Sequence, residues 1–219
     1  MRCIIVGGSR GIGRAIAARL SAQGHAVASM SRADQNLDLG WPDAKIHEAM
    51  DAEVGKLGGL DWLVLSGGMG AYLGMFEADS ERVGKLMQTN FLGPLQVYRR
   101  ALPALLKTKG KVLWIGSTVV THGARGLAVY AATKATVDGF VRSEARGLAR
   151  HGVAMNVLSP GWIATEMTAE IKPEIRQGII RSIPLRRMGE AEEVAEMAVG
   201  ILETSHFLTG SVIEMTGGA

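Results

Sequence analysis

Three side chains near the middle of the chain could move a proton: Ser117, Tyr130 and Lys134. Tyr130 and Lys134 are four residues apart in a helical pattern, and on a helix this spacing puts their attachment points about 5–6 Å apart on one face. An ammonium group that close favours the phenolate, so we expect Lys134 to lower the pKa of Tyr130 from its ordinary value of about 10. A tyrosine tuned in this way can act as a general acid or base near neutral pH. Ser117 ends the apolar run KVLWIG and could bring a hydroxyl to the same place.

A structural alternative exists for this pair. Tyr130 could be a half-buried packing residue and Lys134 a solvated surface charge. The spacing alone does not decide between the two, so the elements that position these side chains have to be considered.

The composition predicts one globular domain over residues 1–219. The chain is 47% hydrophobic and 21% charged, and its length suffices for a sizeable core. The net charge of +3 comes without a basic block, which argues against nucleic acid as a partner. The single cysteine, Cys3, excludes an intrachain disulfide and fits a reducing compartment. We see no signal-peptide pattern and no apolar run near 18 residues, so we expect a cytoplasmic protein without a membrane partner.

A glycine-rich turn follows the first apolar run. Residues 2–6 are apolar, and Gly7-Gly8-Ser9-Arg10-Gly11-Ile12-Gly13 leads into the helical pattern RAIAARLSAQG. Glycines permit a close approach of phosphate, and a helix N-terminus offers free N–H groups and a favourable dipole. The spacing G-x-x-x-G-x-G differs from G-x-G-x-x-G, but the mechanics are the same. The segment predicts a dinucleotide site; the alternative is a tight strand-to-helix connection.

The second strand, HAVASMS, ends at Ser31-Arg32. In NAD-specific sites an acidic residue near this strand end binds the ribose hydroxyls. Two guanidinium groups, Arg10 and Arg32, would instead suit a 2′-phosphate through charge-assisted hydrogen bonds. We therefore expect NADP(H). The alternative is that both arginines are solvated.

Alternating strand and helix patterns predict an α/β fold, a Rossmann-type doubly wound parallel sheet with helices on both faces. The stretch after Arg32 is too short for a normal crossover helix and a full strand, so we expect both to be shortened, with residues 37–39 as a stub of strand and Asp38 near the adenine. Asn90 is polar within an apolar helical pattern at 80–107, so it either caps a kink near Pro94 or faces a polar site. Residues 162–189, interrupted by Pro173 and Pro184, suit a substrate lid. The remaining expected elements are helices at 43–57, 127–150 and 190–203 and strands at 61–65, 111–117, 152–162 and 211–215.

In its ordered landmarks the chain resembles the short-chain dehydrogenase/reductase family over nearly its whole length. The landmarks are the glycine turn, Thr89-Asn90, Ser117, Tyr130-x-x-x-Lys134, Pro160-Gly161 and Thr165. The C-terminal segments IPLRRMGEAEEVAEMAVGIL and FLTGSVIEMTGG are most similar to the 3-oxoacyl-(acyl carrier protein) reductase branch.

The resemblance implies roles for these residues. Tyr130 would be the general acid in reduction or the base in oxidation, and Lys134 would lower its pKa and bind the nicotinamide ribose. Ser117 would hydrogen-bond the substrate oxygen, and Asn90 would hold a water that connects Lys134 to solvent. Thr165, with backbone near Ile163, would contact the nicotinamide carboxamide. The full cofactor-binding set is Gly7, Ser9, Arg10, Gly11, Ile12, Gly13, Arg32, Asp38, Ser66, Gly67, Gly68, Asn90, Tyr130, Lys134, Pro160, Gly161, Ile163 and Thr165; no metal site is expected.

The chain departs from the family pattern after the strand at 61–65. Leu65-Ser66-Gly67-Gly68 stands where the family has Asn-Asn-Ala-Gly, and Ser66 could replace one of the lost hydrogen bonds. The shortened segment after Arg32 puts Asp38 as an adenine contact in doubt.

Several nearby residues have two possible roles. Trp162, Met69 and Met167 could line an apolar substrate pocket. His122 and Arg125 could touch substrate, although an exposed loop role is favoured. Arg186 and Arg187 could meet an acidic carrier protein, although helix-flanking surface charges are favoured.

The sequence thus predicts an NADPH-dependent oxidoreductase that interconverts a small-molecule ketone, for example a 3-oxoacyl thioester, and a secondary alcohol. The alternative is a non-catalytic NADP(H)-binding sensor or scaffold of the same fold. By resemblance we expect a homotetramer, or else a dimer. The sequence does not identify the substrate or the physiological direction.

Overall fold

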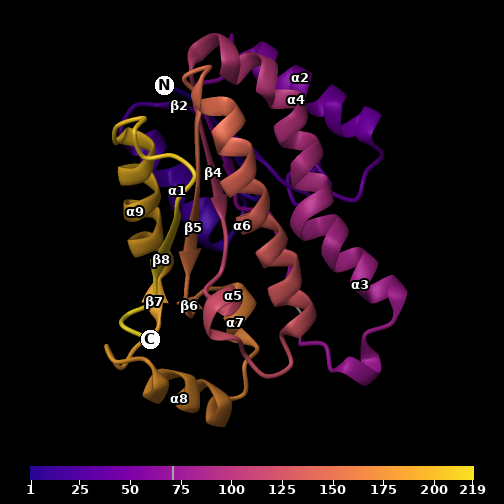
Figure 1. Ribbon diagram of the computed structural model, residues 1–219, viewed down its shortest axis with the longest axis vertical. Coiled ribbons are helices and arrows are strands. Elements are labelled where there is room, and N and C mark those ends of the chain that lie inside the picture. Colours follow the sequence, from indigo (N-terminus) through magenta and orange to yellow (C-terminus); the bar gives the residue numbers. More distant parts are fainter. Residues whose placement is uncertain (71) are drawn as a thin grey trace.

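The structure is a computed structural model that describes residues 1–70 and 72–219. One sheet runs through the molecule in the strand order β2-β1-β3-β4-β5-β8, and each neighbouring pair in it is parallel (Figure 1). The predicted doubly wound parallel sheet is confirmed. Its strands are β1 (Arg2–Val6), β2 (Ala26–Met30), β3 (Trp62–Leu65), β4 (Lys111–Ile115), β5 (Ala154–Pro160) and β8 (Val212–Met215).

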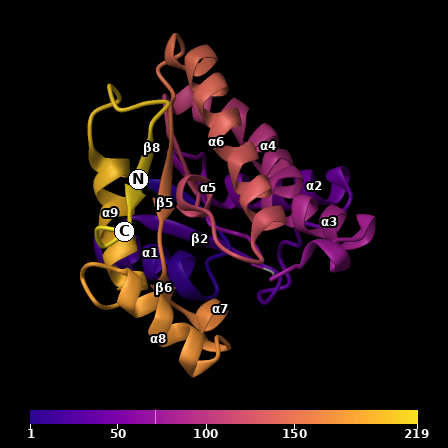
Figure 2. The same cartoon turned by 60° about the horizontal axis from the view of Figure 1, so that its bottom comes forward.

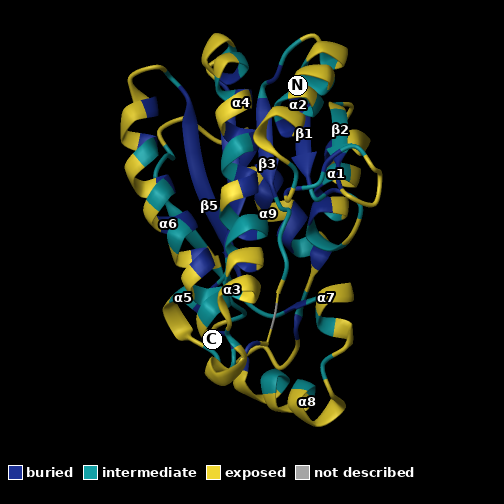
Figure 3. Cartoon of the chain, turned by 90° about the vertical axis from the view of Figure 1, so that its right-hand side faces the viewer, coloured by how far each residue is buried: buried dark blue, intermediate teal, exposed yellow. Residues whose placement is uncertain are grey.

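Helices cover both faces of this sheet. On one face, α1 (Gly11–Ala22) packs against α9 (Ala191–Glu203). On the other face lie α2 (Asp43–Leu57), α4 (Gly93–Thr108) and α6 (Ala128–Ala149). Successive residues of the central strands alternate between two buried clusters, so β1, β3 and β5 are dark blue throughout much of their length in Figure 3, whereas the edge strand β2 is largely intermediate. This double burial explains why the strands are nearly continuous apolar runs in the sequence.

The long helical pattern at 80–107 is not one regular helix. It divides into α3 (Ser80–Met87), a π-helical turn η2 (Gln88–Leu92) and α4. Asn90 lies in the π turn, and Pro94 follows this turn directly, in the first turn of α4. Single π turns occur often at functional sites. Of the two expectations for Asn90, the second is met: its amide faces polar groups, the backbone of Met69 and the hydroxyl of Thr133.

The predicted stub of strand at 37–39 is wrong. All of residues 31–42 are described, and they form a loop without helix or strand. The side chains of Leu37 and Leu39 are buried in the core beside α2, and the Leu39 carbonyl accepts a hydrogen bond from Gln88 Nε2 at 2.9 Å. Because this stretch adds no strand, β2 is the edge of the sheet.

The segment expected to be a lid leaves the body of the molecule at the carboxyl ends of the strands (Figure 2). It contains α7 (Glu166–Ala169) and α8 (Pro173–Ser182). A small parallel ladder of β6 (Ile163–Ala164) and β7 (Gly189–Glu190) joins its two ends. The remaining short elements are η1 (Met75–Glu77) and α5 (Val119–His122).

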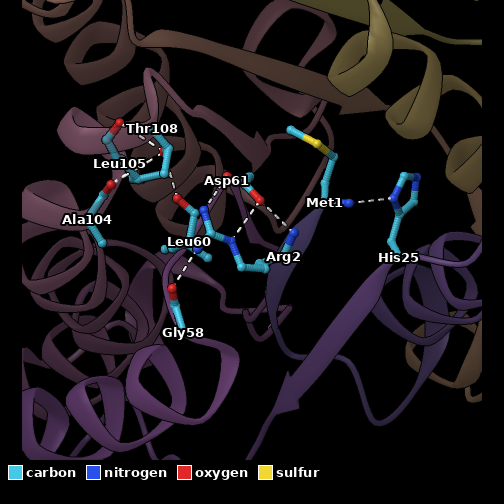
Figure 4. A network of polar contacts seen from close by, with 9 residues as sticks. All are labelled: Met1, Arg2, His25, Gly58, Leu60, Asp61, Ala104, Leu105 and Thr108. Carbon is cyan, nitrogen blue, oxygen red and sulfur yellow. Dashed lines mark hydrogen bonds and ion pairs between the residues drawn. The ribbon is translucent and has the colours of Figure 1, made fainter.

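A charged pair fastens the opposite, amino-terminal ends of the strands. The Arg2 guanidinium grips Asp61 with two hydrogen bonds, Nε to Oδ2 at 3.0 Å and Nη2 to Oδ1 at 2.8 Å (Figure 4). The backbone N–H of Arg2 also donates to Asp61 Oδ2. These bonds hold β1 against the start of β3, because Arg2 begins one strand and Asp61 precedes the other.

In the described part of the chain, no helix is long and apolar enough to cross a membrane.

Candidate active site

Ser117 and Tyr130 meet at the carboxyl end of β4. Ser117 follows this strand by two residues, and Tyr130 lies in the first turn of α6. The Ser117 oxygen accepts a hydrogen bond from the Val119 N–H at 3.3 Å. Its own proton is therefore free to be donated, and its hydrogen bond to the phenol favours the phenolate. Burial acts more strongly in the opposite direction, so the pKa of Tyr130 is raised.

Lys134 lies one turn further along α6 and is buried, with only 6% of its surface exposed. Its Nζ donates to the Ile115 carbonyl at 2.8 Å and lies 5.9 Å from the centre of the Tyr130 ring. Burial lowers the pKa of Lys134 to about 8, and the nearby Asp138 carboxylate partly opposes this shift.

The prediction that Lys134 lowers the pKa of Tyr130 is wrong for this structure. The ammonium is directed at a backbone carbonyl, and desolvation of the phenol dominates its pKa. The spatial pairing of the two residues, in contrast, is as their helical spacing predicts.

Asn90 connects three parts of the site. Its Oδ1 accepts from the Met69 N–H at 2.8 Å, and its Nδ2 donates to the Met69 carbonyl and to Thr133 Oγ1, both at 3.0 Å. Thr133 Oγ1 in turn donates to the Tyr130 carbonyl at 2.7 Å. Both N–H bonds of the Asn90 amide are used within the protein, so a water held by Asn90 would have to donate to one of its oxygens. The amide thus fixes the loop after β3 to the start of α6.

The glycine turn fits a dinucleotide phosphate. Gly7 has φ +81°, and a side chain there would lie 2.7 Å from the Gly67 backbone; at Gly13 it would lie 2.2 Å from the Gly7 carbonyl oxygen. Helix α1 begins at Gly11, and no side chain caps it among the described residues. The turn therefore leaves backbone N–H groups facing the end of the sheet, where an anion is favoured. Ser9 lies in this turn, and Ile12 packs against the core on the α1 and α9 side.

Residues from two further strand ends lie beside the turn. A side chain on Gly11 would come 3.5 Å from Thr165, the N-cap of α7. The Gly161 N–H donates to the Met215 carbonyl at 2.8 Å, and the Pro160 carbonyl accepts from the Thr118 N–H at 3.1 Å. Ile163, in β6, is buried in the same region. The structure thus brings Thr165 to the glycine turn, whereas Pro160 and Gly161 bond to Thr118 and to the end of β8, respectively.

In the Ser66-Gly67-Gly68 segment, Gly68 lies next to the polar side chains of Asn90 and Lys134. A side chain on Gly68 would lie 3.3 Å from Asn90 Oδ1 and 3.7 Å from Lys134 Nζ. The Ser66 N–H donates to the Val6 carbonyl at 3.0 Å. Among the described residues its hydroxyl makes no hydrogen bond, so the replacement of a lost asparagine contact by Ser66 is not seen.

The end of β2 contains an acidic residue that the sequence reasoning missed. Asp34 Oδ2 accepts hydrogen bonds from Ser31 Oγ at 2.7 Å and from Ser29 Oγ at 3.5 Å. Ser29 itself would contact a side chain on Gly8, at 2.5 Å, so Asp34 lies near the glycine turn. Arg10 and Arg32 are exposed there. The signal for Asp34 was a Ser-x-x-Asp spacing, which allows a serine at the strand end to orient a carboxylate.

Asp38 is engaged locally: its Oδ1 accepts from the Gly40 N–H at 2.8 Å. This turn contact uses part of the carboxylate, so its role as an adenine contact stays a prediction.

A cleft of about 720 Å³ opens in front of Tyr130 and Ser117. Trp162 and Met167 line it, as predicted, together with the C-terminal Ala219, and Met69 is not among the described residues that do. His122 also lines the cleft, whereas Arg125 is not among the described lining residues. The sequence did not indicate the additional lining residues Tyr72, Glu170, Lys172 and Ile175. Their position depends on how the loop after β3 and the segment at 165–188 are arranged around the cleft, which no local pattern specifies.

The two arginines proposed as carrier contacts differ. Arg187 forms a bidentate ion pair with Glu193, with both N–O distances at 2.6 Å, which agrees with a charge flanking α9. Arg186 is exposed and donates to the Arg181 carbonyl.

In the described part of the chain, no group of three or more His, Cys, Asp or Glu residues is arranged to hold a metal ion.

Comparisons with known proteins agree with this geometry. Residues 42–219 match the family model described as enoyl-(acyl carrier protein) reductase. The chain is 36% identical to the 3-oxoacyl-[acyl-carrier-protein] reductase MabA of Mycobacterium bovis, over 98% of this chain and 91% of the relative. It is 33% identical to carbonyl reductase family member 4 of Xenopus laevis, over 99% and 96% of the two chains.

A solved structure shows the same architecture. The crystal structure of Cj0485 dehydrogenase superposes with a TM-score of 0.91 at 26% identity, covering 99% of this chain and 92% of that one. Each of these relatives is named a reductase or a dehydrogenase, which favours an oxidoreductase over the non-catalytic alternative. The protein is an oxidoreductase that belongs to the short-chain dehydrogenase/reductase family.

Proposed function

We propose that the protein is an NADPH-dependent ketoreductase that interconverts a ketone and a secondary alcohol. The observation that carries this proposal is that Ser117 and Tyr130 line a cleft of about 720 Å³, while Lys134 lies buried one helical turn behind Tyr130 and close to Gly68. The relatives named 3-oxoacyl-[acyl-carrier-protein] reductase and carbonyl reductase support a carbonyl substrate. A 3-oxoacyl thioester is therefore the first substrate to test.

The nicotinamide dinucleotide, when bound, donates or accepts the hydride. The glycine turn at 7–13 would hold its pyrophosphate, and Lys134 would bind the nicotinamide ribose, since two of the three Nζ hydrogens remain after the bond to Ile115. Ser66 to Gly68 and residues 160–165 would flank the nicotinamide half.

Tyr130 donates the proton that the carbonyl oxygen requires as it becomes an alcohol. Its raised pKa keeps it protonated at neutral pH, which suits a proton donor. The Ser117 hydroxyl, oriented by Val119, hydrogen-bonds the same oxygen and stabilises its developing negative charge. Asn90 keeps the loop and helix in register and holds the water that returns a proton to Lys134. In the oxidative direction Tyr130 accepts the proton.

The choice between NADPH and NADH depends on Arg10, Arg32 and Asp34. The two guanidiniums favour a 2′-phosphate through charge-assisted hydrogen bonds. The Asp34 carboxylate repels a phosphate and instead accepts hydrogen bonds from ribose hydroxyls. We propose NADPH, because two cations face one anion that Ser31 and Ser29 already engage.

Residues 162–189 serve as the substrate lid in this proposal. The β6–β7 ladder joins the ends of this segment, so α7 and α8 can move over the cleft without disturbing the main sheet. Self-association into a homotetramer or a dimer is a further proposal by family resemblance, and the partly exposed Leu92 and Leu106 at either end of α4 are suited to it.

The function is tested with purified protein, NADPH, and a panel of ketones and 3-oxoacyl thioesters. We expect turnover on at least one compound. Tyr130→Phe should reduce it by about 100- to 10 000-fold while the Kd for NADPH changes little. Tyr98→Phe is the matched control, because its hydroxyl bonds Glu144 away from the cleft. A turnover number for Tyr130→Phe equal to that of the wild type would refute the assigned role, and absence of turnover on the whole panel would refute the substrate class.

A further inference from the structure

Helix α6 carries a second buried charge next to Lys134. Asp138 lies four residues after Lys134, and only 9% of its surface is exposed. Side chains of a helix lean toward its N-terminus, so the carboxylate extends over the turn that carries the Lys134 stem. Residues at this spacing are neighbours on one face of the helix. The buried ammonium of the candidate site therefore has a buried carboxylate beside it.

The carboxylate of Asp138 is incompletely satisfied. Its Oδ1 is buried and finds no hydrogen-bond partner among the residues that the structure describes. Burial raises the pKa of Asp138. Among the charged groups that face it, Arg142 and Lys134 on α6 oppose this shift and favour the carboxylate, whereas Glu214 on β8 adds to the shift. Glu214 is itself engaged with α5: its Oε1 accepts from Thr121 Oγ1 at 2.7 Å, and its Oε2 lies 3.9 Å from His122 Nε2.

A carboxylate at this position is costly for packing. Burying a polar group without its hydrogen bonds costs free energy, and a well-packed apolar residue in place of a buried charge often stabilises a protein. The neighbouring α6 positions Val137 and Val141 are apolar and fully buried. Packing alone therefore gives no reason for an aspartate here, whereas the two cations that face it, the exposed Arg142 and the buried Lys134, give an electrostatic one.

We propose that Asp138 is a positioning residue of the candidate active site, whose buried carboxylate keeps Lys134 in its ammonium form. The inference rests on the proposed function, because it is Lys134 as ligand of the nicotinamide ribose that needs the charge. Without Asp138, desolvation acts on Lys134 with less opposition, and the lysine loses its proton at a lower pH. A neutral lysine would have one N–H fewer to donate to the ribose.

A direct measurement of Lys134 separates this inference from the reaction itself. Protein labelled with 13C at the lysine Cε is titrated by NMR, and the Lys134 signal is assigned by its loss in Lys134→Met. We expect a midpoint near 8 in the wild type, and in Asp138→Asn a midpoint lower by about 0.5–1 pH unit, the effect of one partly screened charge a helical turn away. Glu48→Gln, on an exposed position of α2, removes the same charge far from the site and should leave the midpoint unchanged.

Activity and stability provide a second test. In Asp138→Asn the alkaline limb of the kcat–pH profile should move down by the same 0.5–1 unit. Asp138→Val should melt at or above the wild-type temperature and still show the shifted limb, which a merely structural aspartate would not produce.

The outcomes are distinguishable. An unchanged Lys134 midpoint in Asp138→Asn overturns the inference, whether or not the enzyme turns over ketones. A shifted midpoint with no turnover on any carbonyl compound upholds the electrostatic pairing and refutes the proposed function instead.

Discussion

Gly13→Ala is the sharpest test of whether the glycine turn depends on the close backbone contact between Gly13 and Gly7. The added methyl group would lie 2.2 Å from the Gly7 carbonyl oxygen and 2.8 Å from the Gly7 carbonyl carbon. Both contacts are with backbone, so no flexible side chain can move aside. The turn and the start of α1 must separate by about 1 Å to reach normal contact distances. Such overpacking costs about 1–3 kcal/mol.

The same displacement affects anion binding. Moving the first turn of α1 would remove about one charge-assisted backbone hydrogen bond to the cofactor phosphate, worth about 1.5–3 kcal/mol. We therefore expect the Kd for NADPH to rise about 10- to 100-fold. In a chain of this length the stability loss corresponds to a fall of about 5 °C in melting temperature.

Calorimetric titration with NADPH and thermal unfolding, with and without the cofactor, measure both effects. Gly55→Ala is the control: it lies inside α2, and its added methyl group would meet no atom within 4 Å. This variant should gain up to about 1 kcal/mol from helix propensity and keep its affinity. The reasoning is refuted if Gly13→Ala melts and binds NADPH like the wild type.

Other predictions concern the cofactor choice, the β1–β3 contact and the site's pH dependence. Arg32→Ala should weaken NADPH binding more than NADH binding in fluorescence titrations, and Asp34→Asn should do the reverse; equal losses for both cofactors would contradict the phosphate-clamp proposal. Asp61→Asn should lower the melting temperature by a few degrees at pH 7. Pairing with Arg2 depresses the pKa of Asp61 in the folded state, so its stabilisation is complete above the unfolded pKa of about 4 and is lost as the pH falls through the folded pKa; a difference that persisted at pH 2 would argue against the ion pair. The rate of ketone reduction should decline above about pH 8, where Lys134 loses its proton. A stopped-flow reduction rate that stayed constant up to pH 10 would refute this role of Lys134.

Local signals in the sequence predict most of the framework. The helix predicted at 43–57 has the observed bounds of α2, because Pro42 precedes it and Gly58 ends it in a left-handed conformation. The buried strands are recognisable because each is a short apolar run, and the glycine turn because its residues must adopt conformations or contacts that other side chains prevent. The four-residue spacing of Tyr130 and Lys134 similarly requires only that α6 be a helix.

The tertiary structure decides what depends on distant partners. The π turn at Asn90 is associated with hydrogen bonds to Met69 and Thr133, which lie 21 and 43 residues away along the chain. The loop at 31–42 forms no strand because its leucines find the core beside α2, a contact that no local pattern specifies.

The electrostatics of the site also depend partly on local sequence and partly on the tertiary structure. Spacing places Lys134 near Tyr130, but the pKa of the phenol depends on how much of the surrounding protein displaces water from it. Asp34 and Asp138 are ordinary acidic residues in the sequence. Only the folded chain, by bringing Asp34 to the glycine turn and burying Asp138 beside Lys134, determines which charges the site contains.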